Sequence, residues 1–309
     1  MSERDLVARA LVAVAVIAAV AFLLCAQPWR PQSRVSVTLG WVLGLALGVY
    51  AGCWLLSLWP HWPPRDCADR LLILVLPAAL IVELLASLPA TPGWLGIALR
   101  LIVVAGAAPV LLYGSQYVAG TQAWSPGLMW LVLGGLAAAL ALQWLLVALL
   151  VRRAPGMAMP AMLAGVCGGA GVTIMLSSYA TGGQLGLPLA AALGGAALAT
   201  LTSAGLRGSV SWVGPTVAGL FSLLVIGHFF GQLKTTHAAI LFAAPLLAWL
   251  LEAPYVRRLH PWAKEAGRIV LTAAVVAAVA FHAYRLFQED SQGTPGSNEP
   301  TLQDYMDLR

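Results

Sequence analysis

The sequence predicts an all-α membrane protein that crosses the bilayer about ten times and contains a duplicated helical hairpin. Of its 309 residues, 60% are hydrophobic and only 9% are charged, whereas soluble domains carry about 25% charged residues. Apolar runs of about 20 residues recur along the chain, and this is the length that a helix needs to cross the hydrocarbon core. A transmembrane β-barrel would show alternating segments of about ten residues instead, and none are visible.

Ten apolar runs are expected to form the membrane spans. The first can also be read as a signal peptide, but Leu24 before Cys25 makes a poor cleavage site, so a retained helix is favoured. Tryptophans near the ends of several runs, such as Trp94 and Trp124, are typical of an aromatic belt at the membrane surface. The expected spans cover residues 6–26, 35–58, 71–88, 94–113, 126–150, 158–180, 187–204, 213–230, 237–253 and 268–287.

The spans make one expected transmembrane domain over residues 1–288, and the polar, acidic segment 289–309 is expected to be a disordered tail. Lysine and arginine are slightly more frequent in the connections after odd-numbered spans. The positive-inside rule therefore places those connections in the cytoplasm and both termini outside the cell membrane. These loop residues account for the net charge of +5, so the expected partner is the lipid bilayer and not nucleic acid.

Two uncharged connections share a sequence pattern. "SQYVAGTQAW" at 115–124 is followed 62 residues later by "SSYATGGQLG" at 177–186, and residues 98–122 align with 160–184 without a gap. The pattern predicts that spans four and five and spans six and seven are two copies of one hairpin. Because the copies are two spans apart, they are expected to run parallel rather than inverted.

The polar residues of these outer loops have two interpretations. In the first, the tyrosines belong to the aromatic belt and the glycines turn the chain. In the second, the two loops meet on a pseudo-symmetry axis, where their glutamines line a small polar vestibule. The residues concerned are Tyr117, Gln122, Tyr179 and Gln184.

Glycine recurs at every fourth residue of the second span, which places four glycines along one helix face. Such a face allows another helix to approach closely, because no side chains separate the two backbones. The sixth span contains a similar pair. Packing within the protein is the main interpretation, and self-association is the alternative. The residues are Gly40, Gly44, Gly48 and Gly52 in the second span, and Gly165 and Gly169 in the sixth.

Two formal charges, Glu83 and Arg100, lie well inside predicted spans. Both are expected roughly 10 Å below the same surface, on neighbouring antiparallel helices. A lone charge near the bilayer centre costs about 2.5–3.5 kcal/mol on insertion scales, so pairing is the less costly arrangement. The sequence leaves two interpretations open: a structural ion pair, or a substrate or proton site in which Glu83 titrates.

The sequence favours a permease- or channel-like protein for a small solute or ion. The alternative is a non-catalytic assembly subunit, with other membrane subunits or a second copy as partners. A membrane enzyme acting on lipid is a third interpretation, which the segment 252–267 supports only weakly. No catalytic motif, metal-ligand cluster or cofactor motif is visible, and the four cysteines form no C-x-x-C pair. The sequence therefore predicts no catalytic residue, metal or cofactor.

Overall fold

The computed structural model describes residues 3–27, 33–120, 123–202, 209–253 and 260–292, and in these ranges the chain is all-α. The elements, in order, are α1 (Glu3–Ala26), α2 (Arg34–Leu55), α3 (Cys67–Arg70), the π-helical turn η1 (Leu71–Val75), α4 (Leu76–Ser87), α5 (Gly93–Leu112), α6 (Gln116–Ala119), α7 (Pro126–Arg153), α8 (Ala158–Leu176), α9 (Ala180–Gln184), α10 (Gly186–Ala199), the 3-10 turn η2 (Thr200–Thr202), α11 (Val213–Phe229), α12 (Thr235–Ala243), the 3-10 helix η4 (Ala244–Glu252) and α13 (Pro261–Gln292).

Nine helical segments in the described ranges are long and apolar enough to cross a membrane. They correspond to nine of the ten predicted spans, so the chain is an integral, multi-pass membrane protein. The remaining prediction, 213–230, corresponds to α11, which is apolar but only 17 residues long. At the end of the chain, α13 continues to Gln292, beyond the predicted domain end at 288, and the rest of the predicted tail lies outside the described residues.

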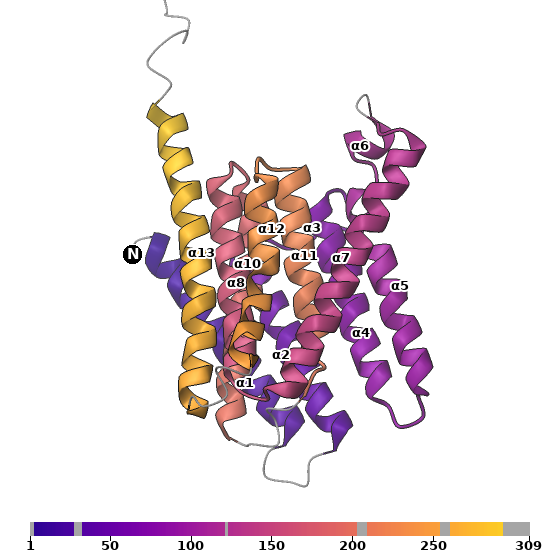
Figure 1. Ribbon diagram of the computed structural model, residues 1–309, viewed down its shortest axis with the longest axis vertical. Coiled ribbons are helices and arrows are strands. Elements are labelled where there is room, and N and C mark those ends of the chain that lie inside the picture. Colours follow the sequence, from indigo (N-terminus) through magenta and orange to yellow (C-terminus); the bar gives the residue numbers. More distant parts are fainter. Residues whose placement is uncertain (1–2, 28–32, 121–122, 203–208, 254–259, 293–309) are drawn as a thin grey trace, which may run out of the picture.

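Helix α11 forms the centre of the bundle. Every residue from Val213 to Gly227 is buried, and α11 contacts α4, α5, α7, α8, α10 and α12. A helix that is hydrophobic on all sides must be covered on all sides by protein or lipid. Here the covering is protein, because α11 lies among the other helices of the bundle (Figure 1).

Prolines account for two irregular stretches. Pro77 lies in the first turn of α4 and has no N–H to donate to a carbonyl one turn earlier, and the preceding residues Leu71–Val75 form a π-helical turn. Pro245 lies at the start of η4, where the ninth span changes from an α-helix to a 3-10 helix. Both spans nevertheless remain continuous helical segments, as the apolar pattern predicts.

Successive long helices run up and down, so the connections fall at two ends of the bundle (Figure 1). We call one the tyrosine end, where α5 leads into α6 and α8 leads into α9. We call the other the arginine end, where α4 leads into α5 and α7 leads into α8. Both loops of the repeated pattern lie at the tyrosine end. There, the ring of Tyr117 packs against Phe229 of α11, and the backbone N–H of Gln232 donates a hydrogen bond of 3.1 Å to the backbone carbonyl of Ser177.

The glycine face of α2 contacts α1 and α10. A Cβ atom at Gly40 would lie 2.9 Å from the carbonyl oxygen of Phe22, and one at Gly44 would lie 3.0 Å from the carbonyl oxygen of Ala18. At Gly48 the added atom would lie 2.5 Å from Cβ of Ala192 in α10. Gly52 continues the same face, where an added Cβ would lie 2.6 Å from Cβ of Pro188. Three helices therefore pack closely because α2 presents no side chains at these positions.

The two glycines of α8 do not form a comparable face. A Cβ atom at Gly169 would lie 2.0 Å from Val276 of α13, so this glycine is needed for a close approach. Gly165 is exposed, and a Cβ atom there would meet nothing within 4 Å. In the described part of the chain Gly165 therefore does not face a closely packed helix, although its neighbours Leu163 and Val166 are buried.

The arrangement of the two ends predicts which loops share a side of the membrane. In a cysteine-free background, Gln116→Cys and Thr181→Cys should react with an impermeant maleimide from one side, and Ala90→Cys from the other. All three positions are exposed in the structure. The positive-inside rule places the first two outside the cell. Labelling of positions 116 and 181 from opposite sides would contradict the arrangement.

Candidate functional site

The carboxylate of Glu83 and the guanidinium of Arg100 form a two-pronged ion pair. Nε of Arg100 donates to Oε1 of Glu83 and Nη2 donates to Oε2, both at 2.8 Å. The two residues lie on the antiparallel helices α4 and α5, close to the arginine end. The side chain of Glu83 is 3% exposed and that of Arg100 is 28% exposed. The carboxylate is therefore almost completely removed from solvent, whereas the arginine still reaches an open space.

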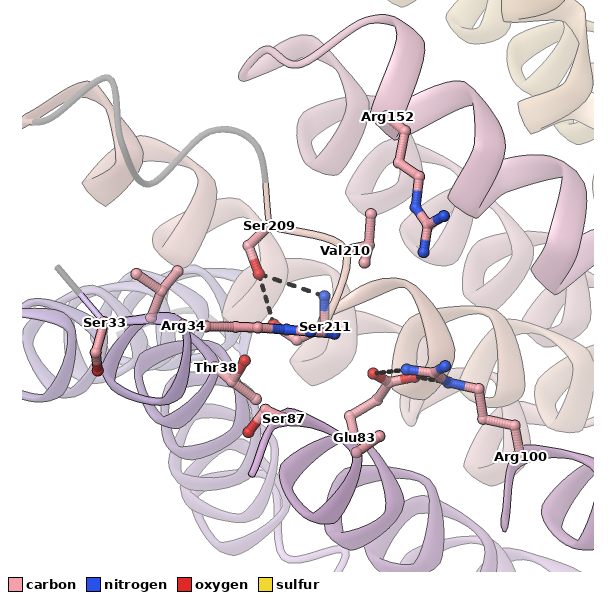
Figure 2. A pocket seen from close by; sticks show the side chains of 12 residues that line it. Ser33, Arg34, Thr38, Glu83, Ser87, Arg100, Arg152, Ser209, Val210 and Ser211 are labelled. Atoms are coloured by element: carbon pink, nitrogen blue, oxygen red, sulfur yellow. Dashed lines mark hydrogen bonds and ion pairs between the residues drawn. The ribbon is translucent and has the colours of Figure 1, made fainter. Parts of the chain in front are cut away.

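That open space is a cavity of about 630 Å³ at the arginine end of the bundle. Helices α2, α4, α5 and α7 line it, together with the segment that leads into α11. Figure 2 shows Arg34, Arg100 and Arg152 around this space, each from a different helix, with the Glu83–Arg100 pair in the wall. The other lining residues are Ser33, Val37, Thr38, Ala86, Ser87, Ser209, Val210 and Ser211.

The cavity carries three guanidinium groups but only one carboxylate. The carboxylate of Glu83 already accepts both of its hydrogen bonds from Arg100. Arg34 and Arg152 are exposed, and neither makes an ion pair with a carboxylate in the described part of the chain. The lining therefore has a formal net charge of +2, because the one internal pair cancels.

Several hydroxyl groups complete the lining. The side chain of Thr38 is 2% exposed and makes no hydrogen bond with another described residue. The hydroxyls of Ser209 and Ser211 lie 2.7 Å apart, so one of them keeps a proton for another acceptor. Ser87 donates its proton to the carbonyl of Leu84 at 2.7 Å. The hydroxyls can both donate and accept, whereas the guanidinium groups of Arg34 and Arg152 only donate, so the charged groups that remain for a ligand are all donors.

The described tyrosines of the outer polar loops have different neighbours. The ring of Tyr117 stacks on Trp124 with centroids 5.3 Å apart, while the hydroxyl of Tyr179 lies 3.8 Å from Sγ of Cys67. Gln184 is half-buried in α9, and Gln122 lies outside the described residues. Burial, with the nearby Cys67 thiol, raises the pKa of Tyr179, so its phenol stays neutral at physiological pH.

His237 pairs with the distant His282 and not with His228, the histidine nearest to it in the sequence. Nε2 of His237 lies 2.8 Å from Nδ1 of His282, which joins α12 to α13 across 45 residues. His228 lies before the turn between α11 and α12, and its Nδ1 is 2.9 Å from the carbonyl oxygen of Leu233. Within the described ranges, no three His, Cys, Asp or Glu side chains lie close enough together to hold a metal ion.

Neither a protein family, nor a curated protein, nor a solved structure shows detectable similarity to this chain. Its function must therefore be argued from the geometry of its own residues.

The sequence drew attention to Glu83 and Arg100 but not to the cavity around them. Arg34 and Arg152 occur in connections, where the sequence assigns them only a role in topology. Ser209 and Ser211 lie in a short polar segment before α11, and no spacing links them to α2 or α7. The one available signal was that Arg34, Arg152 and the serines all belong to connections predicted on the same side of the membrane.

Proposed function

We propose that this chain is a permease-like membrane protein that admits a small solute or ion through its arginine end. The observation that carries the proposal is the polar cavity of about 630 Å³, which has room for a small ligand and is lined by charged and hydroxyl groups. Polar surface inside a helical membrane protein is costly to maintain unless it faces water or a ligand. A purely structural bundle would be more stable with an apolar filling at this place.

The Glu83–Arg100 pair has a definite place in this proposal. It forms the part of the cavity wall nearest the membrane interior, where Glu83 is fully covered and Arg100 is accessible from the cavity. A solute that moves inward from the cavity meets this pair first. We propose that the pair acts as the inner boundary of the site and exchanges hydrogen bonds with the solute.

The internal duplication also belongs to the proposal. Helices α5 and α7, and helices α8 and α10, each run from the arginine end to the tyrosine end and back, as two parallel copies should. The shared glycines, tyrosines and glutamines of 98–122 and 160–184 support a common origin. The two segments pack differently, because Gly106 has open space at its Cβ position whereas an added Cβ at Gly168 would touch Ala190.

One observation favours the alternative of an assembly subunit. An open apolar groove of about 340 Å³ lies between α1, α8 and α10, and small residues such as Ala161, Ala164 and Gly194 line it. The exposed Gly165 lies on the same helix. A groove of small residues allows a helix from another chain to approach closely.

Flux measurements in proteoliposomes test the permease proposal. Chloride, potassium, glycerol and inorganic phosphate should be offered in turn, and at least one should cross faster than in protein-free liposomes. Val210→Trp places a large side chain in the cavity lining and should abolish that flux. Val172→Trp, on the outward-facing surface of α8, is the matched control and should leave it unchanged.

If none of the four probes crosses, the permease proposal fails. If, in addition, a stoichiometric partner co-purifies in mild detergent, the assembly-subunit alternative is supported. Flux that survives Val210→Trp would also contradict the proposal, because it would show that the solute takes a route outside the cavity.

A further inference from the structure

We infer that the cavity at the arginine end binds a phosphate-type oxyanion, with Arg34 and Arg152 as its principal contacts. The inference rests on the proposed function, because it names the chemical class of the solute or regulator that the same cavity binds. Binding and flux are nevertheless separate measurements, so each can fail without the other.

Charge decides the sign of the ligand. The cavity has a formal charge of +2 after Glu83 and Arg100 cancel, and its remaining lining residues are hydroxyl-bearing or apolar. The carboxylate of Glu83 accepts two short hydrogen bonds from Arg100 and is buried, so it offers little to a cation. A ligand with about two negative charges would neutralise the cavity, whereas a cation would be repelled by it.

Hydrogen bonding decides the class of anion. Each guanidinium presents several N–H groups in a planar fork, and this geometry matches two oxygens of a phosphate. Thr38, one turn from Arg34 on α2, and the Ser209–Ser211 pair add hydroxyl groups to the lining. A neutral sugar or polyol could bond to the hydroxyls but would leave the two guanidinium charges without a counter-charge. Halide ions would leave most of these donors without a directed partner.

The helix ends around the cavity do not carry the inference. Helices α2 and α11 begin there, which brings two positive dipole ends, but α4 and α7 finish there and bring two negative ends. These contributions oppose one another. The side chains of Arg34 and Arg152 therefore determine the potential inside the cavity.

A phosphate group can reach the cavity from two sources, namely free inorganic phosphate or the headgroup of an anionic lipid. Basic pockets between transmembrane helices at the cytoplasmic side bind lipid headgroups in other proteins. The two sources present the same chemistry to Arg34 and Arg152, so they are distinguished by experiment rather than by the lining.

The test is equilibrium binding of radiolabelled inorganic phosphate to the full chain in nanodiscs made only of phosphatidylcholine. Arg34→Gln and Arg152→Gln should each weaken binding about ten- to a hundredfold, since each removes hydrogen bonds to a charged group. Arg153→Gln is the matched control, because Arg153 neighbours Arg152 but places its guanidinium over the ring of Trp249, 4.9 Å from the centroid. Arg34 and Arg152 are exposed, so the thermal stability of these variants should equal that of the wild type.

A second set of nanodiscs contains phosphatidylglycerol. If this lipid displaces phosphate from the wild type but not from Arg153→Gln, the arginine at 153 participates and the assignment of residues is overturned. If the lipid displaces phosphate from both proteins, the lipid headgroup is a source of the bound phosphate group. If it displaces phosphate from neither protein, free phosphate is the source. Either result supports the inference. Equal phosphate binding by the wild type and Arg34→Gln/Arg152→Gln would overturn it. Phosphate binding without flux of any probe would refute the permease proposal alone.

Discussion

Replacing Glu83 with glutamine should destabilise the folded protein by about 3 kcal/mol, the lower end of the range for breaking a buried ion pair. The change leaves the Arg100 guanidinium without its partner, beside two further arginines in the same cavity. Arg100→Gln should be similarly costly, because it leaves the carboxylate of Glu83 charged in a place that is only 3% exposed. Thermal unfolding and denaturant titration in a mild detergent would measure both losses.

The double variant Glu83→Gln/Arg100→Gln should recover part of this loss, since two neutral amides can hydrogen-bond to each other. A coupling free energy of about 1–3 kcal/mol is expected for two residues in direct contact. The exposed pair Arg285–Glu289 is a matched control, with N–O distance 4.0 Å and both side chains 64% exposed. Glu289→Gln should change stability by less than about 0.5 kcal/mol. Additive losses in the Glu83–Arg100 cycle would show that the pair is not energetically coupled.

Gly48→Leu should destabilise the protein by about 1–3 kcal/mol or more, because it forces a side chain into a filled contact. Even a Cβ atom at this position would lie 2.5 Å from Cβ of Ala192 and 2.9 Å from Cβ of Ala18. Both alanines are completely buried, so neither can swing aside. The α2 helix would have to move away from α1 and α10 together, which separates three helices at once. The melting temperature of the purified variant measures the effect.

Gly165→Leu is the control for that substitution. It makes the same chemical change in an apolar helix, but at a position where a Cβ atom meets nothing within 4 Å. Its stability should equal that of the wild type. If Gly48→Leu and Gly165→Leu had equal melting temperatures, the close approach of α2 to α10 would be ruled out.

The helical membrane architecture could be predicted from the sequence because it depends on hydrophobic length alone. Each run of about 20 apolar residues has one low-energy arrangement in a bilayer, namely a helix that crosses it. The same argument could not show that α11 is central, since a helix covered by protein and one covered by lipid have the same composition. The sequence did predict that Glu83 and Arg100 lie at matched depth, because the turn between α4 and α5 fixes their relative height.

The rest of the site depends on how helices distant in the sequence are placed around one another. Arg34 and Arg152 are 118 positions apart in the sequence, and only packing around α11 brings them to one cavity. The pairing of His237 with His282 has the same origin. Glycine spacing was informative for α2, where every fourth residue faces a helix. It misled at Gly165, because periodicity identifies a face without showing whether anything covers it.

The shortness of α11 has an electrical consequence. Its 17 residues extend about 26 Å, and the cavity lies directly before its first turn, lined by guanidinium and hydroxyl groups that water can solvate. A hydrated recess has nearly the potential of the adjoining solution, so most of the transmembrane voltage falls across the remaining low-dielectric length. A unit charge that crosses the whole membrane gains or loses about 2.3 kcal/mol per 100 mV. If the proposed permease activity carries an anion past Glu83 and Arg100, the anion would cross most of this difference over a shorter distance, and the rate of its movement should depend on voltage.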